Sequence, residues 1–254
     1  MNKKHKKAPK NNPVQDTSPK IPQNDKIKGE LKITRRELTE KQKKFLEIAL
    51  SKETKMMFVS GPAGTSKTFL AVLSALELLK AHRMSDIIYL RSAVESSDNK
   101  LGYLPGEVAD KLSPYVQPLI DKLSEFLAKP DIDRLQKEGR LESIPIGFLR
   151  GLNWNAKVVI ADEAQNCTVK ELTTLITRVG EFSKVFILGD PDQSDIGAKT
   201  GFAKLMNLFK DEQSKQNGVF TFEFTDDDIV RSGLVKFIIK KLKELPNEKS
   251  TRAN

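Results

Sequence analysis

The chain has 254 residues, of which 38% are hydrophobic and 30% are charged, and its formal net charge is +9. These values are typical of a soluble globular protein with one good-sized core or two small ones. No apolar run is long enough to span a bilayer, and no apolar core of a secretory signal follows the basic N-terminus. The single cysteine, Cys167, excludes an internal disulfide and favours a reducing compartment, so we expect a cytoplasmic protein with no membrane partner.

The two ends of the chain differ from the middle. Residues 1–30 are rich in Lys, Pro, Asn and Gln and carry +5 of the net charge, so we expect a disordered basic tail. Such a tail favours an anionic partner such as single-stranded nucleic acid, although a purely solubilising role explains it equally well. We expect residues 246–254 to be flexible and residues 31–245 to form one folded domain.

Strands and helices alternate along that domain. Thr39 is a candidate N-cap for the first helix, with Gln42 completing a capping box. The apolar patterns predict strands at 55–60, 86–90, 157–161, 184–188 and 219–224, and further helices at 69–82, 169–179 and 234–245. Strands with consecutive apolar residues indicate an α/β fold, with a parallel sheet covered by helices on both faces.

Residues 91–151 do not fit this alternation. The segment is too long for a plain loop. Residues 107–129 have helical spacing that Pro114 and Pro118 interrupt. We therefore expect a helical insertion on the sheet.

A glycine-rich turn joins the strand at 55–60 to the helix at 69–82. It consists of Gly61, Pro62, Ala63, Gly64, Thr65, Ser66, Lys67 and Thr68. The backbone N–H groups of such a turn bind phosphates, a following Lys reaches the terminal phosphates, and the next hydroxyl ligates Mg²⁺. Ser66 stands where Gly is usual, which fits if this residue does not need a positive φ. The alternative is a turn that only connects strand to helix.

Two acidic residues, Asp162 and Glu163, follow the strand at 157–161. They therefore lie at the carboxyl end of a parallel strand, where ligands bind in open α/β sheets. Asp162 is a candidate for holding Mg²⁺ together with Thr68, and Glu163 for orienting or deprotonating the attacking water. Alternatively, both acids cap the helix that begins near Thr168.

Gln193 lies in a turn, Gly-Asp-Pro-Asp-Gln, that ends the strand at 184–188. A glutamine at a strand end can reach a γ-phosphate, whereas the alternative is a simple Asp-Pro turn. Cys167 lies near the acidic pair, but the only histidines are His5 and His82. We therefore interpret Cys167 as a helix-start residue and not as a nucleophile.

The phosphate loop, the Asp-Glu-Ala-Gln box and the Gly-Asp-x-x-Gln turn, in this order, resemble the PhoH-like proteins, relatives of the ATPase core of superfamily 1 helicases. The similarity covers roughly residues 35–245 and includes further segments at 91–95, 100–106, 149–153, 162–166, 177–180 and 228–231. Ser66, Ser92 and Ser232 depart from the family's usual Gly, Pro and His, which affects catalytic tuning more than ATP binding. The short single-domain form resembles virus-encoded members.

The resemblance implies a RecA-like P-loop domain that binds and hydrolyses ATP. In such a sheet the strand at 184–188 lies between the phosphate-loop strand and the carboxylate strand, which brings Gln193 beside Lys67 and Glu163. Gln42 matches the glutamine that reads adenine in related helicases.

A complete superfamily 1 helicase has a second lobe, which supplies an arginine to the γ-phosphate. Only residues 225–254 follow the last predicted strand here. We therefore expect a homo-oligomer, a hexameric ring in the simplest case, in which a neighbour supplies Arg231 or Arg178. An ordinary surface ion pair is the alternative for both.

These observations predict a Mg²⁺-dependent ATPase that acts on or with nucleic acid, with RNA favoured and helicase activity left open. One alternative is a P-loop kinase, which would not need the Asp-Glu-Ala-Gln box. Another is an ATP-dependent binding or switch module with little turnover. A GTPase is disfavoured, because no Asn-Lys-x-Asp string occurs.

Overall fold

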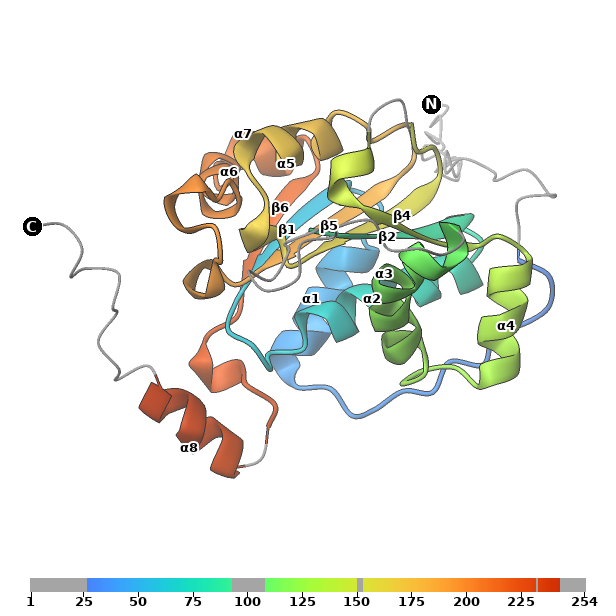
Figure 1. Cartoon of the computed structure of the whole chain (residues 1–254), viewed down its shortest axis with the longest axis horizontal. Helices are drawn as coiled ribbons and strands as arrows, with labels where there is room; N and C mark the ends of the chain where they lie inside the picture. Colours follow the sequence, from blue (N-terminus) through green and yellow to red (C-terminus); the bar gives the residue numbers. More distant parts are fainter. Residues whose placement is uncertain (1–26, 93–107, 150–152, 232, 243–254) are drawn as a thin grey trace, which may run out of the picture.

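The computed structural model describes residues 27–92, 108–149, 153–231 and 233–242 (Figure 1). The predicted tail up to residue 26, the family-like segment 100–106, Ser232 and the predicted flexible C-terminus lie outside these residues. No helix within the described ranges combines the length and apolarity that a bilayer-spanning segment needs.

One six-stranded parallel sheet organises the chain. Its strands, in spatial order, are β3 (Leu141–Pro145), β2 (Asp86–Arg91), β4 (Lys157–Asp162), β5 (Lys184–Gly189), β1 (Met56–Ser60) and β6 (Val219–Glu223). In the register, Ala161 of β4 pairs with Ile187, and Val59 of β1 pairs with Leu188. The phosphate-loop strand and the carboxylate strand thus flank β5, as the family resemblance implied.

Helices cover both faces of the sheet (Figure 1). One core holds side chains of α1 (Glu40–Leu50), α2 (Lys67–Lys80) and α3 (Val108–Leu123), packed on alternate strand residues such as Met57 and Ile160. The other core holds side chains of α5 (Val169–Ile176) and α6 (Phe202–Leu208), packed on their neighbours Phe58 and Val159. The predicted α/β fold with a covered parallel sheet is therefore confirmed.

Local capping explains where two helices begin. In α1, Thr39 accepts a hydrogen bond from the Gln42 N–H, and the Gln42 side chain accepts one from the Thr39 N–H. In α5, Thr168 and Glu171 form the same capping box. The alternative role for Asp162 and Glu163, capping this second helix, is therefore wrong.

The insertion contains helices, but its details differ from the prediction. Helix α3 runs without interruption through Pro114 and Pro118, so the expected break there is wrong. A proline inside a helix costs one hydrogen bond and crowds the carbonyl of residue i−4. The burial of Leu119 and Leu123 of α3 in the core opposes this cost. Helix α4 (Lys129–Lys137) follows, and then the edge strand β3, which the sequence did not predict. Only Pro145 of β3 is buried, and the strand reads Leu-Glu-Ser-Ile-Pro. It therefore lacks the run of consecutive apolar residues that identified the other strands.

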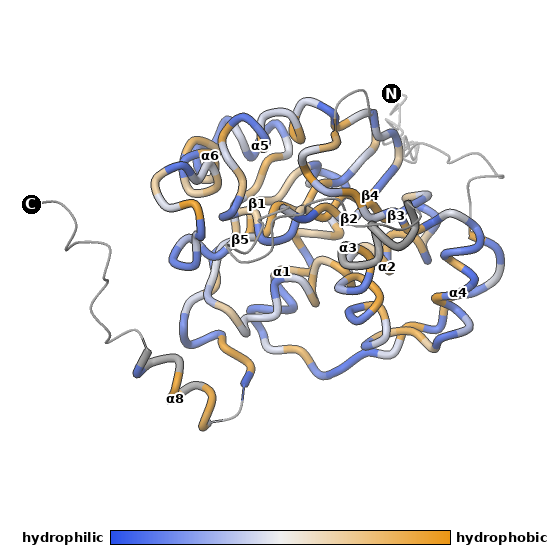
Figure 2. The backbone as a smooth tube through the Cα atoms, in the orientation of Figure 1, coloured by the Kyte–Doolittle hydropathy of each residue, from blue (hydrophilic) through white to orange (hydrophobic). Residues whose placement is uncertain are grey.

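Two further segments also differ from expectation. Ile27 is buried, and the Lys28 N–H donates to Glu138 of the insertion, so these two residues of the predicted tail contact the folded domain. Helix α8 (Gly233–Leu242) stands clear of the sheet (Figures 1 and 2). Its Leu234 and Phe237 side chains are 68% and 59% exposed, so the predicted closing helix does not close the domain core.

After β4, the short helix η3 (Ala164–Asn166) leads to Cys167, which is fully buried. Burial raises the pKa of its thiol to about 12. The thiolate is therefore scarce at neutral pH, which fits a packing residue and not a nucleophile.

Candidate functional site

The phosphate loop follows β1 and ends where α2 begins at Lys67. Two glycines make it possible: Gly64 has a φ of 86°, and a Cβ on Gly61 would lie 2.6 Å from Cβ of Phe224. Ser66 has a φ of 67° and no side-chain cap bond at the start of α2. This position therefore does need a positive φ, and serine adopts it at a cost of about 1 kcal/mol.

Lys67 lies across the loop that precedes it. Its ammonium donates to the carbonyl oxygens of Gly61 at 2.6 Å and Pro62 at 3.0 Å. Burial lowers the pKa of Lys67, and the carboxylates of Asp190, Asp162 and Glu163 oppose that effect. A desolvated cation surrounded by carboxylates suits the binding of a polyphosphate with its metal ion.

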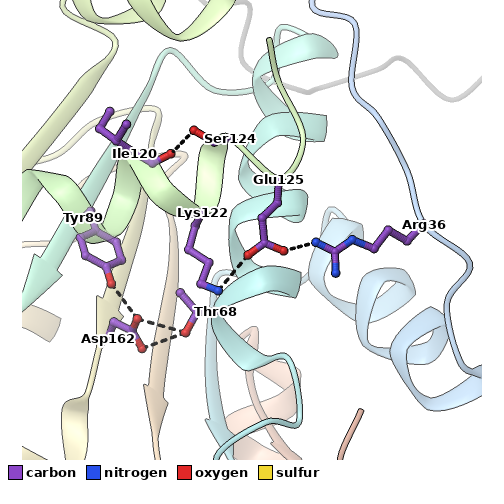
Figure 3. Close-up of polar contacts among 8 residues, drawn as sticks. All are labelled: Arg36, Thr68, Tyr89, Ile120, Lys122, Ser124, Glu125 and Asp162. Carbon is purple, nitrogen blue, oxygen red and sulfur yellow. Dashed lines mark hydrogen bonds and ion pairs between the residues drawn. The ribbon is translucent and has the colours of Figure 1, made fainter. Parts of the chain in front are cut away.

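Asp162 ends β4 and accepts hydrogen bonds from three donors. The Thr68 hydroxyl lies 3.0 Å from Oδ2, and the Tyr89 hydroxyl lies 2.7 Å from the same oxygen (Figure 3). The Glu163 backbone nitrogen lies 3.1 Å from Oδ1. A hydroxyl beside a carboxylate fits Mg²⁺, which prefers hard oxygen ligands and retains several waters. Tyr89 on β2 was not predicted, because no motif in the sequence marks it.

Glu163 takes a left-handed conformation with a φ of 54°. Its Oε2 accepts a 2.6 Å hydrogen bond from the Gln165 amide, and Gln165 Oε1 accepts one from the Asp190 N–H at 3.0 Å. Asp190 Oδ2 in turn accepts from the Ala63 N–H at 3.1 Å. Burial raises the pKa of Asp190, and hydrogen bonds from the Asp192 and Ala63 N–H groups, together with the charge of Lys67, oppose this effect. A hydrogen-bond chain thus joins the carboxylate strand, the end of β5 and the phosphate loop.

One cavity of about 310 Å³ receives most of these groups. Predicted residues that line it are Ala63, Gly64, Ser66, Lys67, Thr68, Asp162, Glu163, Gln193 and Arg231. Gln193 is exposed and belongs to η4 (Pro191–Gln193), where Asp190 caps the turn by accepting from the Asp192 N–H. The tertiary fold therefore gathers side chains that lie far apart in the sequence.

Five predicted residues are not among the described residues that line this cavity: Gly61, Pro62 and Thr65 of the phosphate loop, and Gln42 and Arg178. Gln42 is buried, and its carbonyl oxygen is engaged in the capping box of α1. Only its amide nitrogen remains to read a base. Arg178 lies just beyond α5, where its carbonyl accepts from the Trp154 N–H at 3.2 Å.

Arg231 lies against the phosphate loop of its own chain. The Val230 N–H donates to the Gly64 carbonyl at 3.0 Å, and a Cβ on Gly64 would lie 3.1 Å from Cγ of Arg231. An ion pair of 2.7 Å between Lys41 and Asp228 ties the preceding turn to α1. From the sequence we expect a neighbour to supply Arg231, whereas the structure places this residue beside the phosphate loop of its own chain.

The cavity also has a wall that the sequence did not predict. Arg36, Lys122 and Glu125 line it on the side of Thr68 (Figure 3), and Phe69 lines it as well. Both cations pair with the Glu125 carboxylate, Lys122 at 2.9 Å. They come from the segment before α1 and from the insertion, neither of which carries a recognisable phosphate-binding motif.

A family model described as PhoH-like protein matches residues 34–243. A PhoH-like protein of Bacillus subtilis is 38% identical over 195 residues, which are 76% of this chain and 60% of that protein. A PhoH-like protein of Mycobacterium tuberculosis is 35% identical over 208 residues, 81% of this chain and 57% of that protein.

Protein PhoH of Escherichia coli K12 is 32% identical over 205 residues, or 77% of this chain and 54% of that protein. The chain thus spans little more than half the length of these relatives. The matched region contains the sheet, the phosphate loop and both carboxylates. This chain therefore belongs to the PhoH-like protein family, whose domain is of the P-loop NTPase type.

Proposed function

We propose that this protein binds ATP with Mg²⁺ and hydrolyses it. The observation that carries the proposal is that one cavity holds Lys67, the Thr68–Asp162 pair and Glu163. Lys67 and the N-terminal amides of α2 would bind the phosphates. Thr68 and Asp162 would hold Mg²⁺, which supplies charge neutralisation to the phosphates when bound.

The hydrolytic step needs a base and a group that orients the water. Glu163 lines the cavity beside Gln193, and a neutral amide holds its carboxylate. We assign Glu163 to orient or deprotonate the attacking water and Gln193 to contact the γ-phosphate. Arg231 would stabilise the charge that develops on the phosphates.

Measurement of ATP binding and phosphate release, with no acceptor added, tests this proposal. Lys67→Ala should abolish both, whereas Lys80→Ala, at the exposed end of the same helix, should change neither. Glu163→Gln should keep ATP bound and lower turnover by about 10²-fold or more, as expected for a lost general base. Binding without phosphate release in the unmodified protein would instead indicate a kinase or a switch module.

We also propose that the protein acts with single-stranded nucleic acid, RNA in the first place. The net charge of +9, more than half of it in residues 1–30, supports this proposal. ATP turnover with and without single-stranded RNA or DNA tests it. Removal of residues 1–26, which precede the buried Ile27, should weaken binding and flatten its salt dependence while basal turnover stays unchanged.

A homo-oligomer, a hexamer in the simplest case, is our proposal for the active form. Its support is the apolar surface of α8, where Leu234, Phe237 and Ile238 are 68%, 59% and 44% exposed. Sedimentation of the unmodified protein and of a Leu234→Ser, Phe237→Ser variant tests this. Identical monomeric behaviour of both would contradict it.

A mixture of Arg231→Ala and Glu163→Gln subunits tests where the arginine acts. The position of Arg231 against Gly64 of its own chain predicts no recovery of turnover in the mixture. Recovery would show that the arginine acts across an interface. In that case Arg231 or Arg178 of a neighbour would serve as the arginine finger.

A further inference from the structure

The wall formed by Arg36, Lys122 and Glu125 is not explained by the motifs of a P-loop domain. Lys122 lies near the end of α3 in the insertion, and Glu125 follows that helix. Arg36 lies in the extended segment before α1. All three line the same cavity as Lys67 and Thr68.

Backbone and ring contacts hold this wall in place. The Thr34 N–H donates to the Phe126 carbonyl at 2.8 Å, which joins the N-terminal segment to the insertion. The Phe126 ring lies 4.5 Å from the ring of Phe69, between centroids, and the guanidinium of Arg36 lies 4.9 Å from the same Phe69 ring. A cation held over an aromatic face has a defined position. Backbone, ring and cation–π contacts therefore fix the position of this wall, which does not depend on one surface ion pair.

Charge pairing distinguishes Glu125 from the other carboxylates of the cavity. Asp162 accepts from hydroxyl and backbone donors, Glu163 from an amide, and Asp190 from backbone N–H groups. Glu125 pairs with two cations, one at each oxygen. Partial burial would raise the pKa of Glu125, but Lys122 and Arg36 hold it below its ordinary value. Glu125 thus stays ionised and keeps both cations beside the cavity.

We propose that Arg36 and Lys122 are additional polyphosphate-binding groups, and that Glu125 is the internal counter-ion that a bound nucleotide displaces from them. In Figure 3 the Lys122 side chain points from α3 toward Thr68 and Asp162, the pair assigned to the metal ion. Phosphate oxygens bound there would compete with Glu125 for the same donors. This inference rests on the proposed ATP binding and assigns the insertion a direct part in it.

The proposal predicts that substitutions of the two cations and of Glu125 change ATP affinity in opposite directions. Lys122→Met and Arg36→Gln should each weaken ATP binding, by about 10-fold, because each removes a charge-assisted contact to phosphate. Glu125→Gln should instead tighten ATP binding by about 3-fold, because it removes a negative charge and frees both cations. Loss of packing alone would weaken binding in all three variants.

The chain offers matched controls for both cations. Arg35 lies beside Arg36 in sequence, but pairs with Glu77 at 2.7 Å and does not line the cavity. Lys129 is an exposed lysine at the start of α4 in the same insertion. Arg35→Gln and Lys129→Met should leave ATP affinity unchanged. Thermal unfolding of every variant shows which of them keep the fold.

Calorimetric titration with ATP and Mg²⁺ decides the matter. Opposite signs for Glu125→Gln and Lys122→Met support the proposal. It is overturned if Lys122→Met and Arg36→Gln bind ATP like their controls, or if Glu125→Gln weakens binding as they do. Lys67→Ala, titrated in parallel, distinguishes failure of this inference from failure of the proposed ATP binding. If the unmodified protein binds ATP and Lys67→Ala does not, the ATP binding that we propose stands whatever the cluster does, and absence of binding by the unmodified protein overturns both.

Discussion

Nε2 of Gln165 lies 2.6 Å from Oε2 of Glu163, so a neutral amide holds the carboxylate that we assign as the base. The same side chain accepts a hydrogen bond from the Asp190 N–H, and only 2% of its surface is exposed. Gln165 therefore links the ends of β4 and β5 and orients Glu163 toward the cavity. This role explains why the fourth residue of the Asp-Glu-Ala-Gln box is an amide.

Gln165→Met should lower turnover by about 10-fold or more, because Glu163 loses the donor that orients it. It should also cost about 1–3 kcal/mol in the free energy of unfolding, since the Asp190 N–H loses its acceptor. Steady-state kinetics and urea unfolding measure the two effects. Gln117→Met removes an exposed amide on α3, bonded to Asp121, and should change neither quantity. Full turnover in Gln165→Met would contradict the orienting role.

Tyr89→Phe tests the unpredicted donor to Asp162. The Tyr89 hydroxyl is buried and donates to Oδ2 at 2.7 Å. Burial and the neighbouring carboxylate raise the pKa of Tyr89, so the hydroxyl keeps its proton. Hydrogen bonds to charged groups contribute about 1.5–3 kcal/mol, and we expect the free energy of unfolding to fall by that amount. An unchanged urea midpoint would mean that the other donors satisfy Asp162.

Ser66→Gly should stabilise the protein by about 0.5–1 kcal/mol, because glycine adopts the positive φ of this position without steric cost. Ser74→Gly is the matched control on the same helix. Ser74 is buried in the interior of α2 and its hydroxyl donates to the Leu70 carbonyl, so glycine there loses both helix stability and packing. Urea unfolding should therefore show a higher free energy of unfolding for Ser66→Gly and a lower one for Ser74→Gly. A destabilised Ser66→Gly variant would show that the Ser66 side chain makes a contribution larger than the strain.

Lys184 gives the stability of the protein a dependence on pH. Its buried ammonium donates to the carbonyls of Ala49 and Ser51 at the end of α1. Burial, with a smaller effect of Arg83, lowers the pKa of Lys184 to about 7, from an ordinary value of 10.5. Between these values the unfolded chain binds a proton that the folded protein does not. The contribution of Lys184 to stability therefore rises as pH increases from about 7 to 10.5.

Lys184→Met should remove that rise, which is on the order of a few kcal/mol across the window. Urea unfolding between pH 6 and pH 10 measures the slope of stability against pH for both proteins. Lys44→Met, an exposed position on α1, should keep the slope of the unmodified protein. Equal slopes for Lys184→Met and the unmodified protein would show that this lysine keeps its charge in the folded state.

Much of the fold follows from local sequence. Consecutive apolar residues in β1, β4 and β5 identify buried strands, and the glycines of the phosphate loop identify the turn between β1 and α2. The family resemblance implied that the strand at 184–188 lies between the other two, which brings Gln193 beside Lys67 and Glu163, because the carboxyl ends of parallel strands share one edge of a sheet. These features depend on spacing along the chain and on backbone preferences, which a single sequence displays.

Only the tertiary structure decided the contacts between distant segments. Tyr89 reaches Asp162 because β2 pairs with β4, and Arg36 reaches Glu125 because the N-terminal segment pairs with the insertion. Arg231 lies at its own phosphate loop because the turn after β6 is tied back to α1. Such contacts depend on how elements pack and on where long side chains end, and neither leaves a period or a motif in the sequence.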